Sequence, residues 1–404
     1  MKITAVESVR VAAHPNLLWV RIHTDEGFSG LGETYFGAAS AEADLHERLA
    51  PLLLGEDATR IDYLNRRMRP YVGFAGTGAE IRALSAVDVA LWDIAGKAKG
   101  KPVCDLFGGR VRGEIPVYNT CAGPSYVSKT SAVRPENFGL GTGASRRFED
   151  LDAFLHRADE LAAELIEMGI FSMKIWPFDL AAGAADGLEI SPADLKAALA
   201  PFEKVRAAHG HRMRLKAELH GLWSLPAAKA ICAALEPLAM DWIEDPIWMD
   251  RVWELPALAS HTRAPLAGGE TLGGVGQVEA LMDTGAIATP IVDVTWGGGI
   301  TFGRRCAALA EVRKLPIAFH DCSGPITLAA STHLSLAVPN VREQEIARGM
   351  YYGWYAELVD QPPPITNGAI TVPPGPGLGV ALQPGLEKRK DAVVRRTGLS
   401  ASGR

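Results

Sequence analysis

The segments MRLKAEL (213–219), DWIEDP (241–246) and APLAGGE (264–270) are short apolar runs, and a stretch long enough for one helix separates each from the next. The same alternation begins after residue 109 and continues toward residue 345. Five further segments complete it: IPVYNT (115–120), FSMKIW (171–176), PIVDVT (290–295), LPIAFHD (315–321) and NVREQE (340–345). Parallel strands require crossover helices, so eight such units predict an α/β fold whose sheet closes into a barrel.

The first hundred or so residues follow a different pattern. Val9 and Val11 alternate with polar residues, and the turn at residues 25–27 separates LLWVRIH (17–23) from FSGLGE (28–33), which indicates a hairpin. Apolar residues then fall at helical spacing, most plainly in ALSAVDVALWDIAGKA (83–98). A small α+β domain therefore precedes the barrel.

We expect three parts: an α+β domain over residues 1–113, the barrel over residues 114–365, and a C-terminal segment over residues 366–404. Within this last segment, LGVAL (378–382) is expected to return to the first domain as an edge strand. Residues 123–147 are rich in Ser, Gly and Thr and long for a loop after a barrel strand, which fits either a lid or a surface insertion.

Composition limits the class of protein. The 404 residues are 48% hydrophobic and 22% charged, which excludes a disordered chain, and the net charge of -6 without a basic stripe excludes nucleic acid as a partner. No segment approaches the length of a membrane span, and the five cysteines show no disulfide or zinc spacing. We expect a cytoplasmic enzyme with a small-molecule substrate.

Three acidic residues end successive predicted strands: Glu218, Glu244 and Glu270. Their spacing is about the length of one strand–helix unit, so each occupies the same rim position, and the rim residues of a barrel converge. Three converging carboxylates repel one another unless a cation lies between them. Oxygen ligands without Cys or a His cluster predict one Mg²⁺ per active site.

The next strands continue this register with Asp293, His320 and Glu345. A carboxylate beside an imidazole fixes its tautomer and raises its basicity, so Asp293 and His320 are predicted to form a general base. Lys174 ends the second strand and is predicted to supply a cation across the mouth from His320. His220 lies two residues after Glu218 and is predicted to act as a second acid or base, or as a hydrogen-bond donor to the substrate.

Several longer motifs carry a family resemblance: HTDEGFSGLGET (23–34), SAVDVALWDIAGKAKGKPVCDLFGG (85–109), WIEDP (242–246), GGET (268–271) and GPGLGV (375–380). Over nearly its whole length the chain resembles the enolase superfamily, specifically the mandelate racemase-like acid-sugar dehydratases of the galactonate and mannonate type. The resemblance implies a modified TIM barrel of (β/α)7β type, an N-terminal α+β domain that caps its mouth, and a homo-oligomer.

The resemblance also implies roles for individual residues. The three glutamates match metal ligands, Asp293 with His320 matches a catalytic dyad, and an acid on the eighth strand lies near the substrate carboxylate. Glu345 is the first choice for this acid, and Glu343, which shares its face, remains an alternative. Residues near Leu17 and Phe74 are implied to touch the distal part of the substrate.

Two features of the sequence, compared with the family pattern, favour dehydration over racemisation. A Lys-x-Lys sequence is common on the second strand, whereas here Lys174 is followed by Ile175 and Trp176, and an indole accepts no proton. We expect Trp176 to line the substrate site and His320 to be the base. The Glu218-Leu219-His220 sequence looks like the acid-x-His motif of dehydratases, although the first metal ligand is more often an aspartate.

The sequence therefore predicts a Mg²⁺-dependent dehydratase in which His320 takes the proton beside a carboxylate and His220 protonates the departing β-hydroxyl, giving a 2-keto-3-deoxy acid. Two alternatives remain open. An epimerase, racemase or cycloisomerase would share the first step, and a metabolite-binding protein would keep the fold without turnover.

Overall fold

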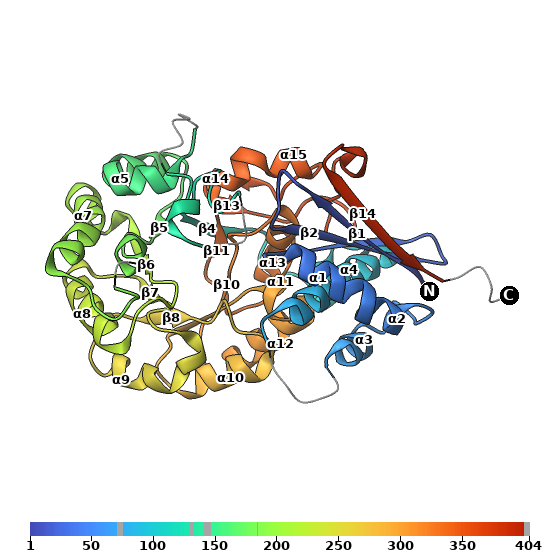
Figure 1. The fold of residues 1–404 in the computed structure, drawn as a ribbon, viewed down its shortest axis with the longest axis horizontal. Coiled ribbons are helices and arrows are strands. Elements are labelled where there is room, and N and C mark those ends of the chain that lie inside the picture. The colour runs from blue at the N-terminus through green and yellow to red at the C-terminus, as the bar shows by residue number, and fades with distance from the viewer. Residues whose placement is uncertain (71–75, 130–132, 141–146, 184, 400–404) are drawn as a thin grey trace.

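The computed structural model describes residues 1–70, 76–129, 133–140, 147–183 and 185–399 of the chain. They form a barrel of parallel strands and helices, beside which an antiparallel sheet packs with helices of its own (Figure 1). The predicted fold class, an α/β modified barrel with an N-terminal α+β domain, is confirmed. None of the helices in these ranges combines the length and apolar character that crossing a membrane requires.

Eight parallel strands build the barrel in chain order, and they are the eight predicted from the apolar segments. β11 pairs with β4, and β10 lies beside β11 next to a parallel bridge between Ile317 and Val341. A short hairpin, β12 (Ile365–Thr366) and β13 (Ala369–Ile370), pairs antiparallel with β4. The barrel strands are β4 (Ile115–Thr120), β5 (Ser172–Ile175), β6 (Arg214–Glu218), β7 (Trp242–Glu244), β8 (Leu266–Gly268), β9 (Thr289–Val292), β10 (Ala318–Phe319) and β11 (Gln344–Ile346).

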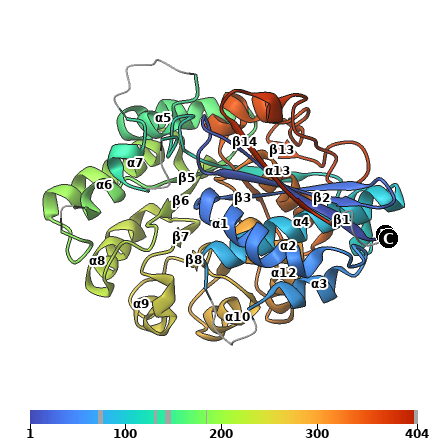
Figure 2. The same ribbon diagram turned by 45° about the vertical axis from the view of Figure 1, so that its right-hand side comes forward.

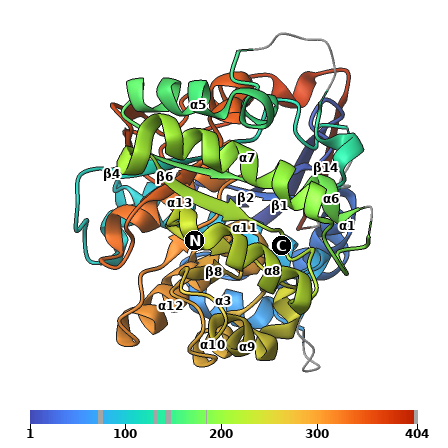
Figure 3. The same cartoon turned by 90° about the vertical axis from the view of Figure 1, so that its left-hand side faces the viewer.

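Helices connect these strands and cover the outside of the barrel (Figure 3). Ser191 and Ser224 begin α7 and α8 because each side chain accepts a hydrogen bond from a backbone N–H of the first turn. The helices are α5 (Asp150–Glu167), α6 (Asp179–Ala182), α7 (Pro192–His209), α8 (Leu225–Leu235), α9 (Leu255–Ala259), α10 (Val275–Asp283), α11 (Val294–Gly297), α12 (Gly299–Val312), α13 (Pro325–Ala337), α14 (Arg348–Met350) and α15 (Ala356–Leu358).

The N-terminal sheet has the order β14-β1-β2-β3, with all neighbours antiparallel. Its strands are β1 (Ile3–Val11), β2 (Leu17–Thr24), β3 (Ser29–Tyr35) and β14 (Ala392–Gly398). The expected edge strand at residues 378–382 was wrong, because β14 takes that place. Leu378 N–H donates to Asp93 and Ala381 N–H donates to Asp360, so carboxylates hold two of the five backbone donors of LGVAL.

Helix α4 lies unusually close to β3 because β3 contains two glycines. A Cβ on Gly30 would lie 2.0 Å from the carbonyl oxygen of Ala90, and one on Gly32 would lie 1.8 Å from that of Ala86. The GxG of FSGLGE therefore serves close packing of backbone on backbone. Helix α4 contacts α11 (Val294–Gly297) and α12 (Gly299–Val312), and Figure 2 shows the N-terminal domain over this part of the barrel. The helices of this domain are α1 (Ala38–Asp44), α2 (Ala50–Leu53), α3 (Ile61–Met68) and α4 (Ala79–Lys99).

Two buried carboxylates of the N-terminal domain attach it to the barrel. Glu33 on β3 accepts hydrogen bonds from Thr327 N–H at 2.9 Å and from the Thr327 hydroxyl, in the first turn of α13. Asp88 on α4 accepts from Thr301 N–H at 2.9 Å, in the first turn of α12. Both acids therefore lie at the positive ends of barrel helices, which stabilises the contact between the domains.

His333 joins the barrel helix α13 to two other parts of the chain. Its Nδ1 accepts from Cys104 N–H at 3.1 Å, so its Nε2 carries the proton and donates to the carbonyl oxygen of Leu378. Burial lowers the pKa of His333 to about 4 from an ordinary value of 6.5. Protonation of Nδ1 would also set two N–H groups against each other, so the folded protein holds this ring neutral.

This ring predicts a loss of stability in acid. Because the folded pKa lies below the unfolded one, the unfolded chain binds the proton first, and stability falls as pH drops from about 6.5 to 4 by up to roughly 3 kcal/mol. Urea unfolding at pH 7 and pH 4.5 measures the difference. His333→Gln should lose less stability between the two pH values, whereas His156→Gln, at an exposed position, should behave as the unsubstituted protein. Equal losses in all three proteins would contradict the assignment.

Candidate active site

The predicted carboxylates and histidines meet at a cavity of about 860 Å³ where the carboxyl ends of the barrel strands face the N-terminal domain. The barrel supplies most of its wall, and Phe36 and Arg82 come from the N-terminal domain. Predicted site residues that line it are Lys174, Trp176, His220, Glu270 and His320.

The three glutamates predicted as metal ligands lie together. Glu218 and Glu244 are paired across β6 and β7, and Glu270 follows β8 by two residues. One carboxylate oxygen from each lies within 4.8 Å of the others, and all three side chains are buried. Burial and then repulsion from Glu218 raise the pKa of Glu244 to about 8, and burial raises that of Glu270. The cluster therefore favours a bound cation.

Lys174 lies among these carboxylates. Its Nζ is 2.5 Å from Glu244, 2.9 Å from Glu345 and 3.1 Å from Glu218. Burial lowers its pKa, but the three carboxylates outweigh that effect and hold the pKa well above its usual value. Glu218 Oε2 is the oxygen that pairs with Lys174, whereas Glu218 Oε1 accepts from the backbone N–H of His220.

Glu345, and not Glu343, is the eighth-strand acid of the site. Glu345 contacts Lys174, the Thr120 hydroxyl and the Asp321 N–H, and although burial opposes ionisation, Lys174 lowers its pKa to about 2. Glu343 lies before β11 begins and pairs with Lys216 at 3.0 Å and with Arg214. The alternative of Glu343 at the substrate is therefore wrong, because two residues of strand place it toward the other end of the barrel.

Asp293 and His320 form the predicted pair. His320 Nδ1 donates to Asp293 Oδ2 at 2.6 Å, while Asp293 Oδ1 accepts from the N–H groups of Thr295 and Trp296. His320 Nε2 therefore faces the cavity, 3.5 Å from Glu270. Burial lowers the pKa of His320, but the neighbouring carboxylates, Glu270 first, raise it well above its ordinary value.

A second histidine is held in the same way on the other side of the cavity. His220 Nδ1 donates to Asp179 Oδ2 at 2.7 Å, and its backbone N–H donates to Glu218. Burial opposes its protonation, but Asp179 and then Glu218 raise its pKa to about 10. Trp176 packs edge-on against this ring, with centroids 5.8 Å apart, and its buried indole N–H has no partner in the described ranges.

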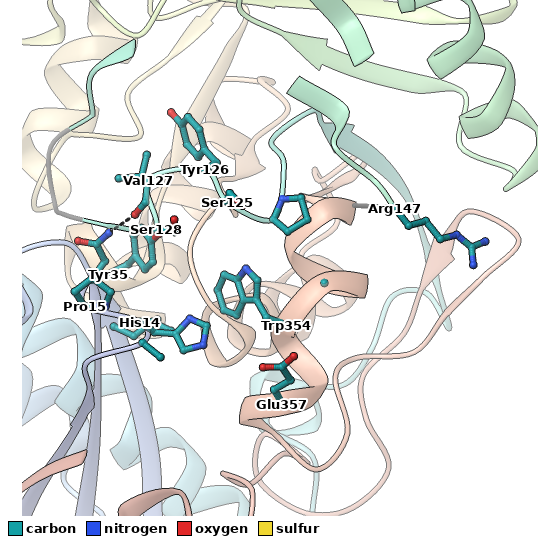
Figure 4. A pocket seen from close by; sticks show the side chains of 15 residues that line it. His14, Pro15, Tyr35, Ser125, Tyr126, Val127, Ser128, Arg147, Trp354 and Glu357 are labelled. Atoms are coloured by element: carbon teal, nitrogen blue, oxygen red, sulfur yellow. Dashed lines mark hydrogen bonds between the residues drawn. The ribbon is translucent and has the colours of Figure 1, made fainter. Parts of the chain in front are cut away.

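Leu17 does not line this cavity, contrary to expectation. It is 1% exposed and lines a separate cavity of about 590 Å³ between the β1–β2 turn, residues 124–128 and the segment around Trp354 (Figure 4). Tyr126 lines both cavities. The prediction failed because Leu17 begins β2 with its side chain in the domain core. Phe74 lies outside the described residues, as do parts of the 123–147 segment.

Sequence reasoning missed several lining residues, including Arg82, Phe36, Trp296 and Asp179. Asp179 had a usable signal, because it lies just after β5 on the segment that carries Lys174. Phe36 and Arg82 had no such signal in the sequence, because their approach to the barrel depends on how the two domains pack.

Two family models match the chain. The model described as mandelate racemase / muconate lactonizing enzyme, N-terminal domain, matches residues 3–108, and the one described as enolase C-terminal domain-like matches residues 157–386.

Individual proteins match over nearly their full length. A D-galactonate dehydratase of Variovorax paradoxus is 33% identical over 387 residues, which cover 94% of this chain and 92% of that protein, and one of Ralstonia pickettii is 31% identical over 97% and 95%. Among solved structures, an enolase of the mandelate racemase subgroup from Agrobacterium tumefaciens is 44% identical, covers 98% of this chain and 99% of its own, and has a TM-score of 0.87. An enolase from Sargasso Sea environmental sequence is 40% identical over 99% of both chains, also with a TM-score of 0.87.

The geometry of the triad predicts that Mg²⁺ stabilises the fold. At a free concentration of about 100 Kd, binding adds roughly 3 kcal/mol to the free energy of unfolding, which thermal melts with and without Mg²⁺ detect. Glu218→Gln should abolish the rise in Tm. Glu343→Gln is the matched control, a buried barrel glutamate outside the triad, and should keep the rise. A rise that survives Glu218→Gln would place the metal elsewhere.

Proposed function

The chain belongs to the mandelate racemase/muconate lactonizing enzyme family of the enolase superfamily, and from that premise we propose that it is a Mg²⁺-dependent dehydratase of acid sugars. Membership in this family confirms the resemblance that the sequence motifs indicated. Relatives named D-galactonate dehydratase, which match over most of the chain, support a lyase that removes water from a sugar acid.

One observation carries the proposal: two histidines, each held by its own carboxylate, line the same cavity as Glu270 of the acidic triad. His320 is oriented by Asp293 and His220 by Asp179, both through Nδ1. Elimination of water needs a base for the α-proton and an acid for the departing hydroxyl, and two separately oriented imidazoles fit that pair of tasks. A racemase would need a second base opposite His320, and Trp176 occupies the position that a lysine commonly holds.

The donor set of the triad fits Mg²⁺, because it offers three buried carboxylates with one oxygen of each within 4.8 Å of the others. Glu218, Glu244 and Glu270 would hold the ion. When bound, it would offset the charge of Glu270 that raises the pKa of His320, and would stabilise negative charge that develops on the substrate carboxylate.

The protein's own groups complete the reaction. Lys174 is held by Glu345 and provides a second cation beside the triad, where it stabilises the charge on the substrate carboxylate as the α-proton leaves. His320 accepts that proton at Nε2, the nitrogen that faces the cavity. His220, whose pKa is about 10, is protonated at neutral pH and gives its proton to the β-hydroxyl as water departs. The product is an enol that becomes a 2-keto-3-deoxy acid.

Two substitutions separate the base from the acid. His320→Asn should abolish both α-proton exchange in D₂O and formation of the keto acid, because an amide cannot accept the α-proton. His220→Asn should slow keto-acid formation by about 10²- to 10⁴-fold, the usual contribution of a general acid, while exchange continues. NMR follows exchange, and reaction with semicarbazide follows the keto acid. Unchanged dehydration by His220→Asn would refute its role as the acid.

A further inference from the structure

Arg82, in the first turn of α4, contributes a cation to the wall of the catalytic cavity. Its side chain is half-buried, yet its guanidinium forms no ion pair with any described residue. The remaining residues of the chain, 71–75, 130–132, 141–146, 184 and 400–404, carry no acidic side chain. Removing a charge from water without an opposite charge is costly, so an unpaired guanidinium in a cavity wall suggests an external anion.

Two hydrogen bonds and one ring contact hold the guanidinium of Arg82 in place. Nη1 donates to the carbonyl oxygen of Tyr35 and Nε to that of Thr77 at 3.3 Å. The guanidinium also lies over the ring of Trp296, 4.8 Å from its centroid. Nη2 donates to none of the described residues. The Trp296 ring is in turn 4.7 Å from that of His320, so Arg82 lies on the side of the cavity that holds the base.

Arg206 differs from Arg82 in how fully backbone carbonyl groups accept its hydrogen bonds. Arg206 also lacks an ion pair among the described residues, but its Nε, Nη1 and Nη2 all donate to backbone oxygens, and it does not line the catalytic cavity. Arg348, the most deeply buried arginine, pairs with Asp150 and Glu164. Burial lowers the pKa of Arg82 to about 10, and the charges of Asp293 and Glu80 offset only part of that effect.

We propose that Arg82 binds a second carboxylate, at the end of the substrate remote from Lys174, so that the substrate is a sugar acid with a carboxylate at both ends. This inference rests on the proposed dehydratase function and narrows its substrate class. A planar guanidinium with a free Nη2 forms charge-assisted hydrogen bonds to a carboxylate, whereas a neutral hydroxymethyl end would leave its charge unpaired.

A second arginine in the cavity wall is less suited to bind the remote carboxylate. Arg134 lines the cavity too, but it is exposed, so water already solvates its charge. The relatives named D-galactonate dehydratase carry the name of a monoacid, and the proposal therefore separates this chain from them in substrate.

The experiment compares matched substrates that differ only in the oxidation state of C6: galactonate with galactarate, gluconate with glucarate, and mannonate with mannarate. Keto-acid formation is measured with Mg²⁺ for the unsubstituted enzyme, Arg82→Met and Arg82→Lys. Arg60→Met is the matched control, because Arg60 belongs to the same domain and lies over the ring of Tyr63, 3.9 Å from its centroid, outside the cavity.

We expect the best diacid to exceed its monoacid in kcat/KM. Arg82→Met should lower kcat/KM for the diacid by about 10- to 100-fold, mainly through KM, and change that for the monoacid by less than about threefold. Arg82→Lys should recover part of the loss, and Arg60→Met should change neither. Preference for a monoacid would overturn the proposal. So would an equal fall of kcat for both substrates, since Arg82 would then act only by supporting Trp296.

Failure of the dehydratase function is distinguishable from failure of this inference. If no pair yields a keto acid, the proposed function is wrong, and calorimetric titration of galactarate and galactonate with Mg²⁺ present still tests Arg82. Tighter binding of galactarate that disappears in Arg82→Met supports the contact. Equal binding of the two acids by the unsubstituted protein overturns it.

Discussion

Repulsion among buried carboxylates is the constraint on which the site depends. Glu218, Glu244 and Glu345 surround a single ammonium group, that of Lys174, and Glu270 adds a further charge beside them. One lysine cannot balance four carboxylates in a low-dielectric interior, and burial and then repulsion from Glu218 raise the pKa of Glu244. The barrel keeps these groups together because parallel strands in register bring their carboxyl ends to one rim.

The N-terminal domain takes part in this arrangement through hydrogen bonds as well as by covering the cavity. Glu33 on β3 accepts from the Thr327 hydroxyl, which lies 3.3 Å from that of Thr295, and Thr295 in turn donates to Asp293. Asp293 orients His320. The N-terminal sheet therefore binds a threonine that lies beside the one bonded to Asp293, and the position of that domain helps to set the surroundings of the proposed base.

The barrel and the acidic triad could be predicted because both follow from periodicity along the chain. Glu218, Glu244 and Glu270 repeat at the length of one strand–helix unit, and no knowledge of tertiary contacts is needed to align them. The placement of Glu343 depended on where β11 begins, and that of Leu17 on which side of β2 faces the domain core. Arg82 could not be found, because it reaches the cavity only through packing of one domain on the other.

The pairing of β1 with β14 has a consequence for folding during synthesis. Val11 lies opposite Ala392, so β1 cannot pair with β14 until the ribosome has synthesised the whole barrel. The barrel segments leave the ribosome in the order in which they pair, whereas this sheet closes across the full length of the chain, a contact of very high sequence separation. Completion of the covering domain, and with it of the cavity wall that carries Arg82, is therefore expected to be among the last events of folding.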